Sequence, residues 1–93
     1  IFSNCNSFVG DVSNWDVSNV TDMYSMFINC YDFNGDLSDW NVSSVSNCRY
    51  MFYGCYSLRT DLSNWKLPKN CSNNDMFTNC DNIVVPDWYR SMY

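Results

Sequence analysis

The sequence repeats with a period of 25 residues. A fixed period of this length is the signature of repeat architectures, because one unit is too small to bury its own apolar face and must pack it on the next unit. The period therefore predicts a repeat solenoid of about 3.5 coils. The columns that define it are Phe2, Phe27, Phe52 and Phe77; Cys5, Cys30, Cys55 and Cys80; Asp11, Asp36 and Asp61; Ser13, Ser38 and Ser63; and Trp15, Trp40 and Trp65.

One repeat unit contains the signals of a short turn followed by an extended segment. Phe27, Cys30 and Phe33 are spaced by three, which suits a short helical or 3-10 turn. Trp40 and Val42 then share one face by the two-residue alternation of a strand. We therefore expect 25-residue coils with short parallel strands, and with the Phe, Cys and Trp columns packed inward.

The repeat pattern weakens toward the end of the chain. The segment Lys66-Leu67-Pro68-Lys69-Asn70-Cys71 replaces the Asp-Val-Ser-Asn-Val-Thr pattern of the first row. Pro86 stands where the Asp column would continue. We expect solenoid repeats over residues 1–82 and an irregular C-terminal segment or cap over residues 83–93.

The composition favours a structural or binding protein over an enzyme. The chain has no His, the commonest general acid/base and a frequent metal ligand, and no nucleophile–base pair is visible. A formal net charge of -5 argues against binding to nucleic acid, and no apolar run is long enough for a membrane span. Six Cys in 93 residues indicate an oxidising, extracellular compartment.

The motif M-F-x-x-C-x-x-F-N-x-D-L-S-x-W-x-V-S-x-V resembles the BspA-like bacterial surface protein repeat, which is related to the leucine-rich repeats and also occurs in mycoplasma surface lipoproteins and protists. The resemblance runs from Ile1 to about Asn82. It implies a leucine-rich-repeat-like solenoid, exposure on a cell surface, and a role in adhesion or in binding protein or matrix. It implies no catalytic residues and no cofactor.

Two columns are candidates for chemistry. The carboxylates of Asp11, Asp36 and Asp61 would repel one another unless they accept backbone hydrogen bonds in Asx-type turns, which we expect, or share a cation such as calcium, which is the alternative. The column of Cys5, Cys30, Cys55 and Cys80 is expected to be buried and reduced, although disulfides within it stay open.

Cys48 and Cys71 lie outside the Cys column, where the repeat departs from its own pattern. Their offset places them on adjacent coils, within reach of a disulfide, and we expect one there. A zinc site is the weaker alternative, because the chain lacks both His and a close C-x-x-C pair.

Three Asn residues, Asn19, Asn41 and Asn70, begin N-glycosylation acceptor motifs. In a eukaryotic secretory pathway we expect glycans on Asn19 and Asn41, with Asn70 less favoured beside Cys71. In a bacterial source we expect none.

Two classes of function fit these features. The first is a non-enzymatic building block of an extracellular fibre or surface layer, whose partners are copies of itself end to end, because Ile1 and Phe2 would leave an apolar end to be covered. The second is a cell-surface adhesin or recognition module that binds a protein or glycan. Its expected binding face comprises Tyr24, Tyr31, Tyr50, Tyr53 and Tyr56.

Overall fold

The chain advances through four-residue turns that recur at the same place in successive 25-residue rows. In the computed structural model, which describes residues 10–90, the amide of each Trp in the predicted column donates to the carbonyl three residues earlier. The N–O distance is 3.1 Å for Trp15 to Val12, for Trp40 to Leu37 and for Trp65 to Leu62. The sequence period is therefore also a period of the local backbone path.

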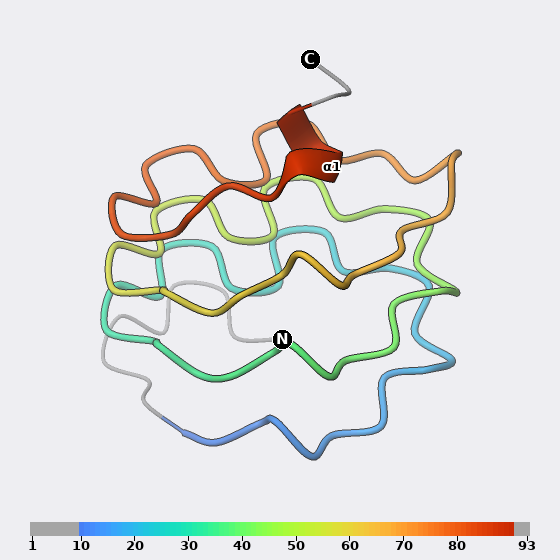
Figure 1. Ribbon diagram of the computed structural model, residues 1–93, viewed down its shortest axis with the longest axis horizontal. Helices are drawn as coiled ribbons and strands as arrows, with labels where there is room; N and C mark the ends of the chain where they lie inside the picture. Colours follow the sequence, from blue (N-terminus) through green and yellow to red (C-terminus); the bar gives the residue numbers. More distant parts are fainter. Residues whose placement is uncertain (1–9, 91–93) are drawn as a thin grey trace.

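Neighbouring rows lie side by side (Figure 1), and in one segment of the row every second amide donates to the next row. The amides of Met23, Ser25, Phe27 and Asn29 donate to the carbonyls of Asn47, Arg49, Met51 and Tyr53, and those of Cys48, Tyr50, Phe52 and Gly54 donate to Ser72, Asn74, Met76 and Thr78. The intervening amides bind within their own row, as Ile28 does to Ser25 and Cys30 does to Phe27. In this segment, half of the amides therefore bind the neighbouring row and the other half bind groups of their own row.

The predicted leucine-rich-repeat-like solenoid with short parallel strands is wrong. Residues 10–90 form a compact body with no strand and one short helix, α1 (Asp87–Arg90). Only isolated parallel bridges occur there, between Asp22 and Asn47 and between Asn47 and Ser72. Strands fail to form because the alternate amides turn back into their own row, so no continuous ladder of hydrogen bonds can develop.

Residues in the left-handed region make this alternation possible. They fall into two columns with the sequence period: Ser25, Tyr50 and Asp75 have φ of 55°, 57° and 55°, and Asn29, Gly54 and Asn79 have φ of 57°, 76° and 62°. The amides of four of these residues, Ser25, Asn29, Tyr50 and Gly54, donate to the next row. Positive φ is costly for most side chains, so the inter-row bonds are made at the expense of local backbone energy.

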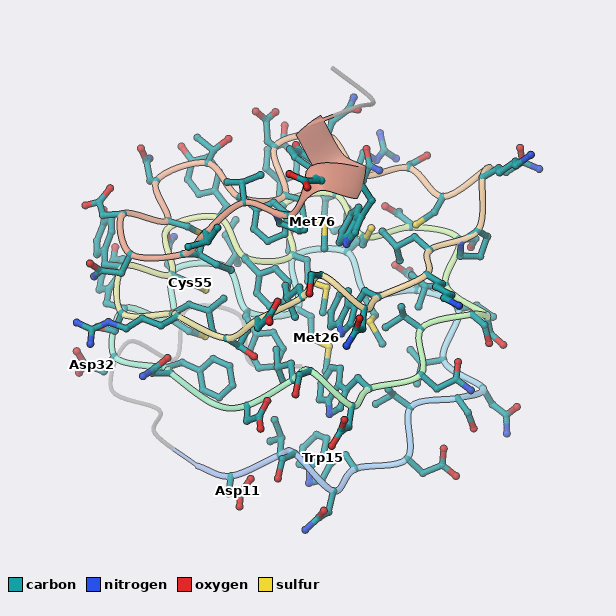
Figure 2. All side chains as sticks on the ribbon, in the orientation of Figure 1. Asp11, Trp15, Met26, Asp32, Cys55 and Met76 are labelled. Carbon is teal, nitrogen blue, oxygen red and sulfur yellow. The ribbon has the colours of Figure 1, made fainter. Side chains whose placement is uncertain are left out.

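Phenylalanine rings stack along the centre of the molecule. Phe27 and Phe52 lie 5.7 Å apart with an interplanar angle of 5°, and Phe52 and Phe77 lie 5.7 Å apart at 12°. All three side chains are buried, together with Trp40, Trp65 and the interior residues Met26, Cys55 and Met76 (Figure 2). Each buried ring contributes about 1.5–3 kcal/mol, so this column is a main source of stability.

The tryptophan column is tied to the backbone of the preceding row. The indole Nε1 of Trp40 donates to the carbonyl of Val12 at 3.0 Å, and Trp65 donates to Leu37 at 2.8 Å. Trp15, in the first described row, differs from the predicted inward packing because its side chain is 44% exposed.

Helix α1 supplies the tryptophan of the last row, although it does not follow the 25-residue spacing. The Nε1 of Trp88 donates to the carbonyl of Leu62 at 2.8 Å, which repeats the bond made by Trp65. The ring of Tyr89 stands edge-on to Phe77 at 5.0 Å, and α1 lies at the top of the molecule in Figure 1. The described part of residues 83–93 therefore packs on the core, while the predicted boundary at residue 82 stays a prediction.

Substitution of Gly54 by Ala tests the need for positive φ. A Cβ at this position would lie 2.6 Å from Oδ1 of Asn29, and φ is +76°. We expect Gly54→Ala to lower the free energy of unfolding by about 1–3 kcal/mol, measured by urea denaturation.

The matched control is Asn79→Gly, in the same column with φ of 62°. Glycine adopts this conformation without strain, so the control should unfold within about 0.5 kcal/mol of the parent. A Gly54→Ala protein as stable as the parent would contradict the role assigned to this column.

Candidate functional site

The predicted aspartate column forms a row of Asx turns on the surface. In each turn the carboxylate Oδ1 accepts a hydrogen bond from the amide two residues later, and in the first two also from the hydroxyl of the same serine. The amide bonds are 2.9 Å for Asp11 and Ser13, 3.0 Å for Asp36 and Ser38, and 2.9 Å for Asp61 and Ser63. The expected Asx turns are therefore present.

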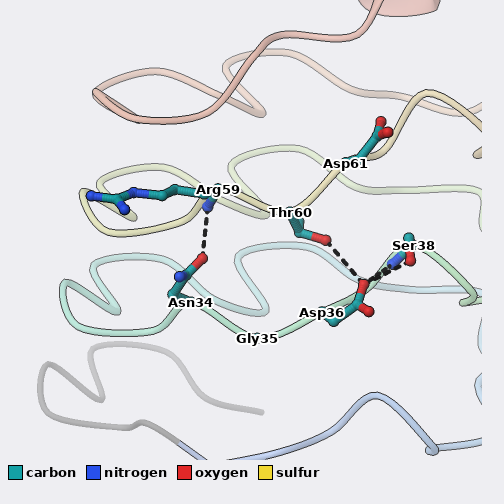
Figure 3. A pocket seen from close by; sticks show the side chains of 7 residues that line it. All are labelled: Asn34, Gly35, Asp36, Ser38, Arg59, Thr60 and Asp61. Carbon is teal, nitrogen blue, oxygen red and sulfur yellow. Dashed lines mark hydrogen bonds between the residues drawn. The ribbon is translucent and has the colours of Figure 1, made fainter.

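A polar groove of about 400 Å³ lies between two of these turns (Figure 3). Its polar groups are engaged with one another. The amide of Arg59 donates to Oδ1 of Asn34 at 2.8 Å, and the hydroxyl of Thr60 lies 3.5 Å from Oδ1 of Asp36. Gly35 is needed at the floor, because a Cβ there would lie 2.5 Å from the ring of Phe33.

The hydrogen bonds of the aspartate column favour the ionised form of its carboxyl groups. The Ser38 hydroxyl and then its amide lower the pKa of Asp36, whereas at Asp11 and Asp61 the pKa is lowered first by the amide of the serine two residues on and then by its hydroxyl. These carboxylates stay ionised at neutral pH, so they are not placed to act as general acids. No group of three or more His, Cys, Asp or Glu able to hold a metal ion occurs within residues 10–90, so the calcium alternative gains no support there.

The cysteines of the repeat column bind the preceding row. The thiol of Cys55 donates to the carbonyl of Phe27 at 3.0 Å, and that of Cys80 donates to Phe52 at 2.7 Å. Cys30, Cys55 and Cys80 are free thiols, and Cys5 lies outside the described residues. Burial raises the pKa of Cys80 to about 11 and that of Cys55 further, so both are protonated and poorly nucleophilic at neutral pH.

The structure brings Cys48 and Cys71 together from adjacent rows. Their sulfur atoms lie 3.2 Å apart, and both side chains are buried. Both are thiols in the structure, so the expected disulfide is not formed in it. Burial and then the neighbouring thiol raise the pKa of Cys48, which disfavours a thiolate, and thus a zinc ligand, at this place.

The three predicted glycosylation acceptors lie on the surface. Asn19, Asn41 and Asn70 are all exposed. The neighbouring residue Val42 is buried and Val20 packs against the core, which is the arrangement expected from the sequence. Occupancy of these sites stays a prediction.

The predicted tyrosine face separates into two groups. Tyr50 stands edge-on to Tyr24 at 5.9 Å and to Tyr53 at 5.8 Å, and the guanidinium of Arg49 lies 5.9 Å from the centre of the Tyr24 ring. In the second group Tyr31 and Tyr56 are stacked, with ring centres 4.9 Å apart and an interplanar angle of 15°. Tyr24 is 50% exposed and Tyr56 is 42% exposed, which gives both groups an accessible edge.

Comparison with known proteins places the chain in a family. Residues 1–88 match the family described as Mycoplasma protein of unknown function, DUF285. The chain belongs to this family. No curated protein matches it, and no solved structure matches it. Because the description of DUF285 assigns no activity, the functional argument depends on the geometry given above.

Within this DUF285 chain, replacement of Ser38 by Ala tests the electrostatics of the aspartate column. Loss of the hydroxyl bond should move the pKa of Asp36 back up toward its ordinary value, while that of Asp61 stays unchanged as an internal control. Carboxyl chemical shifts followed by NMR during a pH titration give both values.

The lowered pKa of Asp36 also makes the stability of the fold depend on pH. A carboxyl whose pKa is lower in the folded state stabilises the fold above its unfolded pKa, and this contribution is lost as the pH falls through the folded pKa. Stability should therefore fall as the pH is lowered below about 5, and less steeply in Ser38→Ala. An unchanged slope would show that the Ser38 hydroxyl has no part in it.

The Cys48–Cys71 disulfide can be tested by peptide mapping without reductant. The bond needs the sulfur atoms to approach by about 1 Å. It would close a loop of 23 residues and stabilise the fold by about 3–4 kcal/mol in the chain-entropy model. Cys55 should stay a free thiol in the same digest, and recovery of Cys48 and Cys71 as free thiols from native material would contradict the bond.

Proposed function

We propose that the chain is a non-enzymatic structural protein of the cell exterior, a building block of a fibre or surface layer that contacts copies of itself end to end. The resemblance to BspA-like surface repeats supports the extracellular location. Among residues 10–90 no helix has the length and hydropathy to cross a bilayer. One observation carries the proposal, namely an edge of backbone donors on the last row.

The amides of the last described row differ from those of the rows before it. In the two rows before it, the equivalent amides, such as those of Tyr50, Phe52 and Gly54, donate to the row beyond. Within residues 10–90 the amides of Asp75, Phe77 and Asn79 donate to no backbone carbonyl. Asp75 and Asn79 are exposed, so this edge is accessible to the carbonyls of another chain.

Such an edge supports open-ended assembly. A row of unpaired backbone groups is a template for pairing with a second chain, and contact between the last row of one copy and an earlier row of another is heterologous, which generates filaments when the rotation does not close. The rings add little to this junction, since Trp88 and Tyr89 already lie against Phe77. Ring stacking on Phe77 by a second copy therefore gains no support.

Backbone hydrogen exchange at several protein concentrations tests the proposal. The amides of Asp75, Phe77 and Asn79 should exchange more slowly as concentration rises, while those of Tyr50 and Phe52 stay protected throughout because they are bonded internally. Sedimentation velocity should show species larger than the monomer over the same range.

A matched pair of variants makes the test specific. Thr78 lies at this edge and Asn64 lies on an earlier row, and both are exposed. Thr78→Arg should abolish the large species by steric obstruction, whereas Asn64→Arg should not. A monomer at every concentration, with unchanged amide exchange, would contradict the fibre proposal.

The tyrosine surface supports the second candidate, a recognition module. Tyr24, Tyr50 and Tyr53 with Arg49 form a partly exposed cluster of the residue types that dominate binding hot spots. Its ligand would be a protein or glycan at the cell surface. A stable monomer in the experiment above would leave this surface as the candidate binding site.

A further inference from the structure

A second groove lies where the third row departs from the repeat. The positions of Asp16 and Asn41 are taken by Lys66, and those of Ser18 and Ser43 by Pro68. Asp16 and Asn41 each accept a hydrogen bond from the amide of the serine two residues later. Lysine has no acceptor and proline no amide, so this turn cannot form in the third row.

The third row turns one residue later instead. The amides of Val20 and Val45 bind Val17 and Val42, but in the third row Cys71 binds Pro68. The apolar residue of this column is also less buried in the third row. Val17 and Val42 are buried, whereas Leu67 is only partly buried. The displaced turn therefore leaves apolar surface accessible.

This surface forms one wall of a groove of about 300 Å³. Trp65, Leu67 and Pro68 line it from the third row, and Trp88 lines it from α1. Both indoles are fixed by their hydrogen bonds to Leu37 and Leu62, so the aromatic walls are preorganised. A volume at the lower end of the range for ligand pockets suits one large apolar side chain.

The charge at the rim is opposite to that of the rest of the molecule. Lys66 and Lys69 are exposed and line the groove, whereas the chain as a whole has 10 acidic and 5 basic residues. Two ammonium groups beside an apolar groove complement carboxylates that flank an apolar group. An extended acidic polypeptide carries both kinds of group in one chain, with carboxylates for the two lysines and an apolar side chain for the groove, and is therefore the favoured partner.

We propose that this groove, lined by Trp65, Leu67, Pro68 and Trp88 and flanked by Lys66 and Lys69, binds an extended acidic peptide segment of a partner protein that inserts one large apolar side chain. The site goes beyond the proposed function. It is built from residues other than the open edge of the last row and other than the tyrosine surface, so the outcome at one does not decide the other.

Titration of the full, ¹⁵N-labelled chain with a capped Asp-Asp-Phe-Asp-Asp peptide tests the site. The indole resonances of Trp65 and Trp88 should shift saturably, with a dissociation constant on the order of 10⁻⁴–10⁻³ M at low salt, while that of Trp40 stays in place. A peptide with Ala in place of Phe should lose the apolar contribution, and one with Asn in place of Asp should lose the charge contribution. Each should bind at least about fivefold more weakly.

Variants of the protein identify the charges. Lys66→Gln with Lys69→Gln should weaken binding about fivefold to tenfold, and 0.5 M salt should do the same to the parent. Arg59→Gln, which removes an exposed cation at the polar groove, should leave the affinity unchanged.

Several results would overturn the proposal: no saturable shift of Trp65 and Trp88, equal shifts of Trp40, equal affinity for the Asn peptide, or equal affinity of the double lysine variant. Equal affinity for 4-phenylbutyrate, a free carboxylate with the same ring, would show that the groove takes small carboxylates, and would also overturn it.

Discussion

The alternation of backbone amides is the constraint on which the rest of the structure depends. Because every second amide over residues 23–29 and 48–54 reaches the next row, successive rows are held at one register, and like side chains are brought face to face. The Phe column stacks for this reason, and the indoles of Trp40 and Trp65 meet carbonyls of the preceding row. The same alternation requires positive φ at two places in the row, where Ser25 and Asn29 lie. Hydrogen bonding, packing and backbone strain are thus linked at a single segment of the repeat.

The 25-residue period predicted which side chains are buried, but not the backbone that buries them. Phe27, Phe52, Trp40 and Cys55 are in the core, as their columns indicate. The prediction of leucine-rich-repeat-like strands is wrong because a sequence period indicates only which residues of neighbouring rows are in contact. It carries no information on whether the backbone amides point along the row or across it. The positive φ of the column Asn29, Gly54 and Asn79 could have been predicted from the sequence, since Asn and Gly are the residues that tolerate the left-handed region best. Trp88 could not be found by spacing, because α1 shifts it out of register.

The candidate sites also divide into those that the sequence predicts and those that it does not. The aspartate turns were predictable because an Asp two residues before Ser contains both halves of the hydrogen bond. The approach of Cys48 and Cys71 to 3.2 Å was also expected from their offset. The groove beside Lys66 was not, because it depends on the other wall, which α1 provides from outside the repeat. Sequence offsets therefore located contacts within and between the rows, and missed the groove whose second wall comes from α1.

The direction of the inter-row bonds has a mechanical consequence. The backbone hydrogen bonds that join the rows run between one row and the next, and within residues 10–90 each row binds only its immediate neighbours. A force that pulls the rows apart is therefore parallel to these bonds and acts on one boundary at a time. Under tension such a molecule extends in steps, each of which releases the backbone of one row, about 25 residues long, rather than giving way all at once. The resistance of each step depends on the few amides, the thiol and the indole that cross the boundary in question.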